Sequence, residues 1–192
     1  MTRGLAEIRD ATPEDAEALH TIWCDFTSQS RRPPVESSSI PQVRSAIARL
    51  EADPGERLLV AVLDGRAVGV AHLRQAPVSP IHEKDAFHIG YLHVLSGQRR
   101  RGVGRQLLEA AAEWAEQQES RHIVASAAAT ARDAHRFLAR LGLSQVAVVR
   151  ACTVATLRTK LGASGTRSTA VKSPATNVLA TRRLMRRARA SA

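Results

Sequence analysis

An arginine- and glycine-rich turn is the stretch whose residue types and spacing point most directly to chemistry. Between the strand-like run FHIGYLHVL and an amphipathic helix lie Arg99, Arg100, Arg101, Gly102, Val103, Gly104 and Arg105. The first turn of a helix leaves backbone N–H groups without intrahelical partners, at the positive end of the helix dipole. Glycine lets an anion approach that backbone closely, and arginine adds paired donors. The turn therefore predicts a phosphate site.

The usual nucleotide motifs do not explain this turn. It has no lysine followed by Ser or Thr, as a P-loop has, and no third glycine of a dinucleotide-binding fingerprint. A solvated basic turn without a ligand is the alternative that the arginine run alone leaves open. The elements around the turn are needed to choose between these interpretations.

Helix and strand patterns run from Leu5 to about Leu161, and the length of the chain favours one domain. Thr12 predicts the start of a first helix, and QVRSAIARLEAD predicts a second. Asp64-Gly65 predicts a hairpin between two strands. FHIGYLHVL reads as one continuous strand, RHIVASAAA as the next, and ARDAHRFLARLGL as a helix that Gly142 ends. The run SQVAVVRACTVATLRTKL predicts a final strand or pair of strands.

Arg99-x-x-Gly102-x-Gly104, in this strand-turn-helix context, resembles the acyl-coenzyme A signature of the GNAT superfamily of N-acetyltransferases. The later helix also resembles that family at Ala134, Phe137 and Leu141-Gly142-Leu143. The resemblance covers residues 1–161. It implies an α/β fold of the α+β type, with helices on both faces of a mixed, mostly antiparallel sheet. The fourth and fifth strands of this sheet would run parallel and splay apart.

The resemblance implies acetyl-CoA as co-substrate and a primary amine as acceptor, with transfer inside a ternary complex. The pantetheine arm would hydrogen-bond to the backbone near Leu92, His93 and Val94. The pyrophosphate would lie on the amides from Arg99 to Arg105. The resemblance does not identify the amine, and it is compatible with a homodimer.

Acetyl transfer to an amine needs a base that removes a proton and a donor that polarises the thioester carbonyl. The resemblance places the donor at the N–H of Val94 or Leu95. The family's usual glutamates fall on His88 and Gly90, so the candidate bases are His88 and His93, with His88 slightly favoured. Strand alternation lets only one of them face the cleft unless a bulge intervenes. Equally, both can be ordinary histidines, with water supplying the free amine.

The family's usual acid and an asparagine near it are both replaced in this sequence. The tyrosine of the later helix aligns with Leu138, and the asparagine aligns with Ala131. Tyr91 is the chain's only tyrosine, so a phenolic acid would have to be Tyr91. A thiol needs less help to leave than an alkoxide does, because its pKa is about 8.5. A catalytically weak member that only binds acyl-CoA is the alternative that this departure leaves open.

Other side chains carry weaker signals. Trp23 and Phe26 follow the apolar stripe of the first helix and are expected in the core, whereas Asp25 or Glu36 could meet a cationic amine. Cys24 and Cys152, the only cysteines, read as reduced, partly buried thiols. No histidine stands at ligand spacing from other donors, so we expect no metal.

Charge is distributed unevenly along the chain. Residues 1–120 carry 14 basic and 17 acidic side chains, whereas residues 121–192 carry 14 basic side chains and one acidic one. Residues 162–192 form a basic tail that we expect to be flexible. Its alternative roles are docking on this protein or a partner, and binding nucleic acid or an anionic membrane. The acidic start and the lack of a long apolar run predict a cytoplasmic protein.

Overall fold

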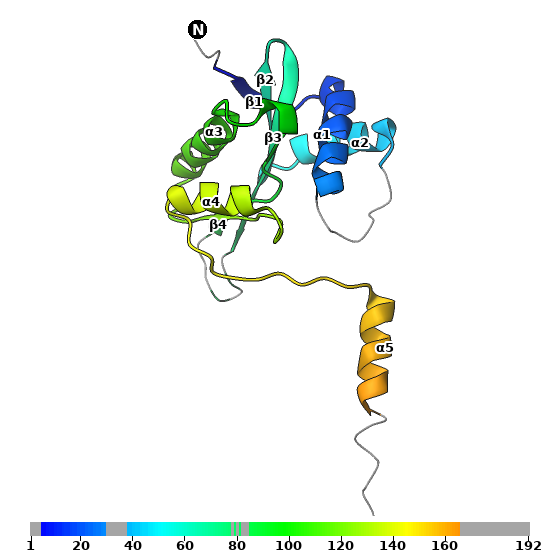
Figure 1. Ribbon diagram of the computed structural model, residues 1–192. Helices are drawn as coiled ribbons and strands as arrows, with labels where there is room; N and C mark the ends of the chain where they lie inside the picture. Colours follow the sequence, from blue (N-terminus) through cyan, green and yellow to red (C-terminus); the bar gives the residue numbers. More distant parts are fainter. Residues whose placement is uncertain (1–4, 30–37, 78, 80, 82–84, 166–192) are drawn as a thin grey trace, which may run out of the picture. The chain divides into compact units, whose positions relative to one another are not determined.

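Six strands form one mixed sheet in the computed structural model, which describes residues 5–29, 38–77, 79, 81 and 85–165 (Figure 1). The strand order is β1-β2-β3-β4-β6, and β5 also pairs with β3. All pairs are antiparallel except β4 with β6. The mixed, mostly antiparallel sheet with one parallel pair confirms the predicted fold class. The strands are β1 (Glu7–Asp10), β2 (Glu56–Leu63), β3 (Arg66–Pro77), β4 (Asp85–Ile89), β5 (His93–Val94) and β6 (Ile123–Ala125).

The predicted hairpin joins β2 to β3 through a two-residue turn. Asp64 and Gly65 both have positive φ, 52° and 73°, as a type I′ turn requires. This backbone matches the twist of the flanking strands and fixes their register, which pairs Leu63 with Arg66. The hairpin forms the centre of the sheet.

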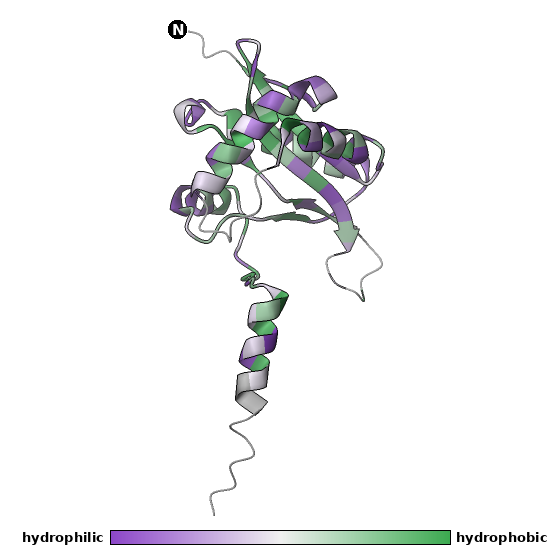
Figure 2. Ribbon diagram, turned by 90° about the vertical axis from the view of Figure 1, so that its right-hand side faces the viewer, coloured by the Kyte–Doolittle hydropathy of each residue, from purple (hydrophilic) through white to green (hydrophobic). Residues whose placement is uncertain are grey.

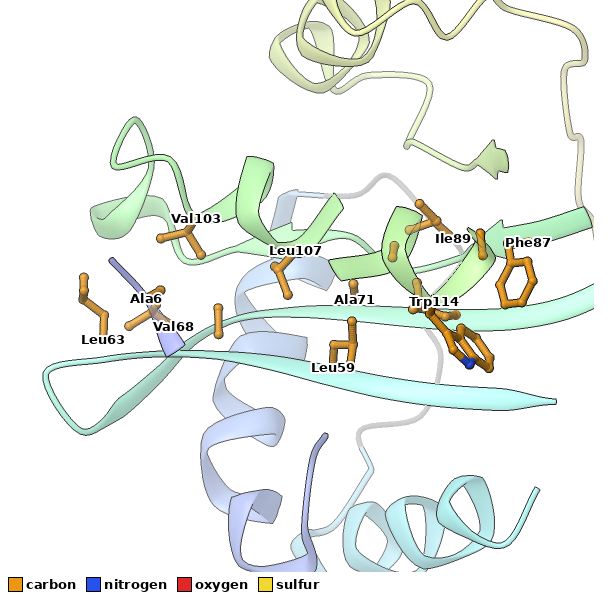
Figure 3. Close-up of a cluster of buried hydrophobic side chains, with 14 residues drawn as sticks. Ala6, Leu59, Leu63, Val68, Ala71, Phe87, Ile89, Val103, Leu107 and Trp114 are labelled. Carbon is orange, nitrogen blue, oxygen red and sulfur yellow. The ribbon is translucent and has the colours of Figure 1, made fainter. Parts of the chain in front are cut away.

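Helices cover both faces of the sheet. On one face lie α1 (Ala16–Gln29) and α2 (Ile40–Glu51), which bury apolar side chains with Val60 and Val70. On the other face, α3 (Val103–Gln117) buries the predicted stripe of Val103, Leu107, Ala111 and Trp114 (Figure 3). Trp114 meets the ring of Phe87 at a centroid distance of 4.4 Å. Polar and apolar residues alternate along the helices (Figure 2), as expected of helices that bury one face.

The start of α1 shows how the sequence positions these helices. A 3₁₀ turn, Pro13–Asp15, precedes α1, and the Asp15 carboxylate accepts a hydrogen bond of 2.8 Å from the N–H of Thr12. Arg9 of β1 donates to both carboxylate oxygens of Asp15, at 2.7 and 2.9 Å. The predicted cap at Thr12 is thus tied to the first strand.

The run FHIGYLHVL is not the single continuous strand that the sequence predicts. It is split into β4 and β5 by residues 90–92. The register against β3 pairs Arg74 with His88, but Val70 with His93, so one extra residue is inserted on the β4–β5 side. This insertion is a bulge, and it reverses the alternation of side chains that follow it.

The last predicted strand is also absent. Residues 144–153 have no regular secondary structure, and Val146, Val148 and Val149 are exposed. Branched residues favour a strand only where a neighbouring strand supplies a partner surface. From Val154 to Gly165 the chain forms helix α5. The Thr153 hydroxyl accepts the N–H of Thr156 at 3.1 Å, as a residue that caps a helix start does.

The described residues fall into two compact units, one ending at Val146 and one beginning at Ala147. The predicted boundary after residue 161 stays a prediction, and residues 166–192 of the basic tail lie outside the described residues. No helix within the described ranges is long and apolar enough to cross a bilayer.

Candidate functional site

The arginine-glycine turn leads directly into α3, as predicted. Gly102 is the N-cap residue and has φ of 87°, a value that strongly favours glycine. The N–H groups of Arg105 and Gln106 both donate to the Gly102 carbonyl, at 2.9 and 3.1 Å. Among the described residues, no hydrogen bond is recorded for the N–H of Val103 or Gly104. Two amides at the positive end of α3 are thus unused.

Two close contacts set the position of this helix start. A Cβ on Gly69 of β3 would lie 3.2 Å from Val103 and 3.3 Å from Leu107, so glycine there allows α3 to lie close to the sheet. A Cβ on Gly104 would lie 3.8 Å from Phe137 and from Val94. Phe137 comes from α4 (Arg132–Arg140), so the helix start lies between β5 and α4.

The arginines of the turn differ in what they contact. Arg99 donates to the Val94 carbonyl at 3.2 Å and to Gln29, whereas Arg101 donates to Gln98 at 2.8 Å. Arg105 pairs with Glu109 at 2.8 Å. Arg100 is exposed, has φ of 63°, and has no recorded hydrogen bond or ion pair within the described part of the chain. Among the four arginines of the described turn, Arg100 is therefore the one whose guanidinium is not held by a hydrogen bond or an ion pair.

The parallel strands beside the turn diverge. β4 pairs with β6 from Phe87 to Ile89, and the last link is the Ser126 N–H to the Ile89 carbonyl at 2.9 Å. β5, further along, pairs only with β3 among the described strands. The Leu95 N–H donates to Val68 of β3 at 2.9 Å. Because successive N–H groups of a strand point to opposite edges, the Val94 N–H points away from β3.

His88 and His93 lie on the same face of the sheet. Arg74 and Val70, their partners on β3, are four residues apart and therefore face the same way as each other. This is the α1 and α2 face, which carries Val60 and Val70. Side chains of a regular strand alternate between the two faces of a sheet, so His88 and His93 would face opposite ways without a bulge. The extra residue of the bulge places both histidines on one face.

The two histidines have different surroundings. The Nε2 atom of His88 is buried, and it has no hydrogen-bond partner in the described residues. His93 is buried against α1, and its Nε2 lies 2.7 Å from a carboxylate oxygen of Asp25. Burial lowers the pKa of His93 below its usual 6.5, although the Asp25 carboxylate opposes this shift. His93 is therefore neutral at pH 7.

An aromatic cluster lies beside this pair. Trp23 and Phe26 of α1 contact the ring of Tyr91 at centroid distances of 5.0 and 5.7 Å, and Phe26 also contacts His93 at 5.4 Å. Trp23 and Phe26 are half-buried and lie outside the core, contrary to the sequence expectation. The core face of α1 is formed by Ala16, Leu19 and Ile22 instead. The aromatic cluster (Trp23, Phe26 and Tyr91) thus lies at the end of α1, outside the buried core and in contact with His93.

Other sequence expectations have mixed outcomes. Leu138 is buried in α4, so this position supplies apolar packing and no proton. Cys24 and Cys152 are both free and exposed, not partly buried. Leu92 is half-buried beside the bulge and packs against the α3 core. Glu36 and most of the preceding loop lie outside the described residues.

A mostly apolar pocket of about 210 Å³ lies against α3, and its lining includes Arg105 at the end of the arginine-glycine turn. The lining also includes Leu108 of α3, Ile123 of β6, and Leu141 and Leu143 after α4. Neither histidine, nor Tyr91, lines this pocket. It is distinct from the cluster around His93.

No sequence pattern points to Gln29 or Ser96, and Asp25 is expected from the sequence only as a contact for a cationic amine. Asp25 and His93 are 68 positions apart, and the exact register of β5 decides that they meet. A polar residue at the end of an otherwise apolar helix stripe is the only local signal for this contact.

Comparisons with known proteins identify the family of this chain. The model of the acetyltransferase (GNAT) family matches residues 16–143. The aminoalkylphosphonate N-acetyltransferase of Salmonella typhimurium strain LT2 is 28% identical over 144 residues, which are 73% of this chain and 86% of that protein.

Solved structures show the same fold. A transcriptional regulator from Bacillus halodurans C-125 superposes with a TM-score of 0.66 at 23% identity, over 77% of this chain and 99% of that chain. An aminoglycoside N-acetyltransferase in complex with CoA superposes with a TM-score of 0.63 at 16% identity, over 80% of this chain and 97% of that one.

Proposed function

The chain belongs to the acetyltransferase (GNAT) family and is an acetyl-CoA-dependent acetyltransferase, and we propose that it acetylates a primary amine by direct attack in a ternary complex. The observation that carries the cofactor site is the start of α3, where the Val103 and Gly104 amides are unused beside arginines. We assign the pyrophosphate to the backbone from Arg99 to Arg105. Arg100, for which the described part of the chain shows no hydrogen bond or ion pair, supplies a positive charge there. The pantetheine arm follows Leu92, His93 and Val94.

The Val94 N–H is the proposed donor to the thioester carbonyl. Of the two candidate amides, Leu95 already donates to Val68, whereas Val94 directs its N–H to the edge where β5 and β6 diverge. An amide that is fixed in a strand costs no reorganisation when negative charge develops on the carbonyl oxygen. This supports Val94 over Leu95.

His93 is the proposed base. The amine nitrogen attacks the acetyl carbonyl, the C–S bond breaks, and CoA leaves as its thiolate. The proton that the nitrogen loses passes to the imidazole, directly or through water, and then to the thiolate or to solvent. Burial keeps His93 neutral at pH 7, so it can accept that proton. His88 is less suitable because its Nε2 is enclosed, and Tyr91 is a candidate donor to the departing thiolate.

The relatives suggest which amines to test first. Some similar proteins are named for acetylation of aminoalkylphosphonates or aminoglycosides. Both names describe small molecules that carry amino groups, which supports a small primary amine as the acceptor of this chain.

A panel of amines tests this proposal. Each amine is incubated with the protein and acetyl-CoA, released CoA thiol is measured, and the product is identified by mass spectrometry. We expect at least one primary amine to give an N-acetyl product at a rate above hydrolysis of acetyl-CoA. Thiol release that is the same with and without every amine would contradict the proposal.

A further inference from the structure

Asp25, near the end of α1, is the centre of a hydrogen-bond cluster. Its Oδ2 lies 2.7 Å from His93 Nε2 and accepts the Gln29 side-chain amide at 2.9 Å. The Ser96 hydroxyl lies 3.1 Å from Oδ1 and 3.2 Å from Oδ2. Burial opposes ionisation of the Asp25 carboxyl, but its hydrogen bonds with His93 and Ser96 outweigh burial and lower its pKa. Asp25 is therefore ionised at neutral pH.

The same cluster reaches the cofactor turn. The Gln29 side chain donates to the Ser96 hydroxyl at 2.9 Å and accepts a hydrogen bond from the Arg99 guanidinium. Arg99 in turn donates to the carbonyl of Val94, the residue after His93. The carboxylate is therefore held from three sides, and it cannot rotate away from His93 without breaking bonds to Gln29 and Ser96.

We propose that Asp25 is the positioning residue for His93, a role that rests on the proposed function of His93 as base. An ionised carboxylate only accepts hydrogen bonds, so the His93 Nε2 facing it must carry the proton. Nδ1 is then the unprotonated nitrogen and receives the proton of the attacking amine. The carboxylate also stabilises the imidazolium that this transfer creates.

The charged groups around His93 fix the direction of the expected effect. Asp25 from α1 raises the pKa of His93, whereas burial and Arg99 from the cofactor turn lower it. Removal of the carboxylate leaves only the two effects that lower the pKa. The acidic limb of the pH–rate profile must then move to lower pH.

Asp25→Asn is the test variant, and Glu17→Gln is its matched control. Glu17 is an exposed acid in the first turn of the same helix, and it takes no part in the hydrogen bonds of the cluster. We expect Asp25→Asn to lower kcat by about tenfold or more, because a misplaced or mis-protonated base loses much of its effect. The KM for acetyl-CoA should change little, and the acidic limb should move to lower pH. Glu17→Gln should leave all three unchanged.

Equal loss in kcat and in folded fraction, with an unmoved acidic limb, would show that Asp25 is only structural and would overturn the proposal. Asp25→Glu keeps the charge and should recover part of the lost kcat.

A measurement without turnover separates this proposal from the proposed function. In the 15N spectrum of labelled protein, His93 should be the Nε2–H tautomer, and its titration midpoint should fall in Asp25→Asn but not in Glu17→Gln. If no amine is acetylated, the proposed function fails while this result still stands. An unchanged tautomer and midpoint in Asp25→Asn would overturn the positioning role, even in an active enzyme.

Discussion

At the scale of single residues, the account rests on the contrast between two histidines of one sheet face. His93 has a carboxylate partner at 2.7 Å, whereas the buried His88 Nε2 has no partner in the described part of the chain. Sequence alone slightly favours His88, because it takes the place of a glutamate that the family uses as base. The structure supports the other histidine, because a hydrogen bond orients it and burial keeps it neutral.

The pH dependence of the wild-type enzyme follows from the state of His93. Its pKa lies below 6.5 in the folded protein, so the base is available at pH 7 and is lost as the pH falls through that lower value. We expect the midpoint of the acidic limb of kcat/KM to lie below pH 6.5 once the ionisation of the amine is accounted for. The pH–rate profile is measured with two amine acceptors of different pKa. The limb that reports the ionisation of the amine should move with the acceptor, whereas the acidic limb belongs to the enzyme and should stay in place. An acidic limb that moves with the acceptor would contradict this assignment.

Replacement of His88 should change the free energy of unfolding. A buried polar atom without a partner costs about 1–3 kcal/mol, so His88→Leu should raise the free energy of unfolding by about 1 kcal/mol. His72 is the control, since it lies on the same face and its Nε2 is 2.9 Å from Glu56. His72→Leu should lower the free energy of unfolding. Urea denaturation measures both, and a destabilised His88→Leu would mean that the imidazole has a partner in solution.

At the scale of elements, the decisive feature is the join between β5 and α3. Gly102 and Arg100 both have positive φ. With this backbone conformation the chain turns directly into α3, and the first N–H groups of the helix remain outside the helical hydrogen bonds. The glycine at 102 could be anticipated from the motif. The left-handed Arg100 could not, because arginine has no preference for that conformation and only the finished turn imposes it.

Arg100 allows backbone and side chain to be tested separately. Arg100→Gly and Arg100→Ala remove the same guanidinium, so both should bind acetyl-CoA more weakly than wild type by similar factors. Only glycine adopts φ of 63° without strain, so Arg100→Gly should be more stable than Arg100→Ala by about 1 kcal/mol. Calorimetric binding and urea denaturation give the two numbers. Wild-type affinity in both variants would remove Arg100 from the cofactor site.

At the scale of the whole molecule, the sequence predicts the elements well where local signals and packing agree. Asp64-Gly65 predicts the hairpin, and the stripe from Val103 to Trp114 predicts the buried face of α3, because periodicity and turn preference are local properties. The β4–β5 bulge and the Asp25–His93 contact depend on register between distant segments, which no local pattern encodes. Residues 144–153 show the converse, since a branched, apolar run without a partner strand stays irregular.

The central claim is that the start of α3 holds the pyrophosphate of acetyl-CoA, and calorimetric titration with acetyl-CoA tests it most directly. A Cβ at Gly104 meets only ordinary contacts at 3.8 Å, so Gly104→Ala should fold and bind within about threefold of wild type. Gly104→Glu places a bulky negative charge at the proposed phosphate position and should weaken binding by at least about tenfold. Gly97→Glu is the control for charge, since a Cβ there meets nothing within 4 Å, and it should weaken binding far less. Equal affinity of Gly104→Glu and wild type, or no binding of acetyl-CoA by the wild-type protein, would contradict the account.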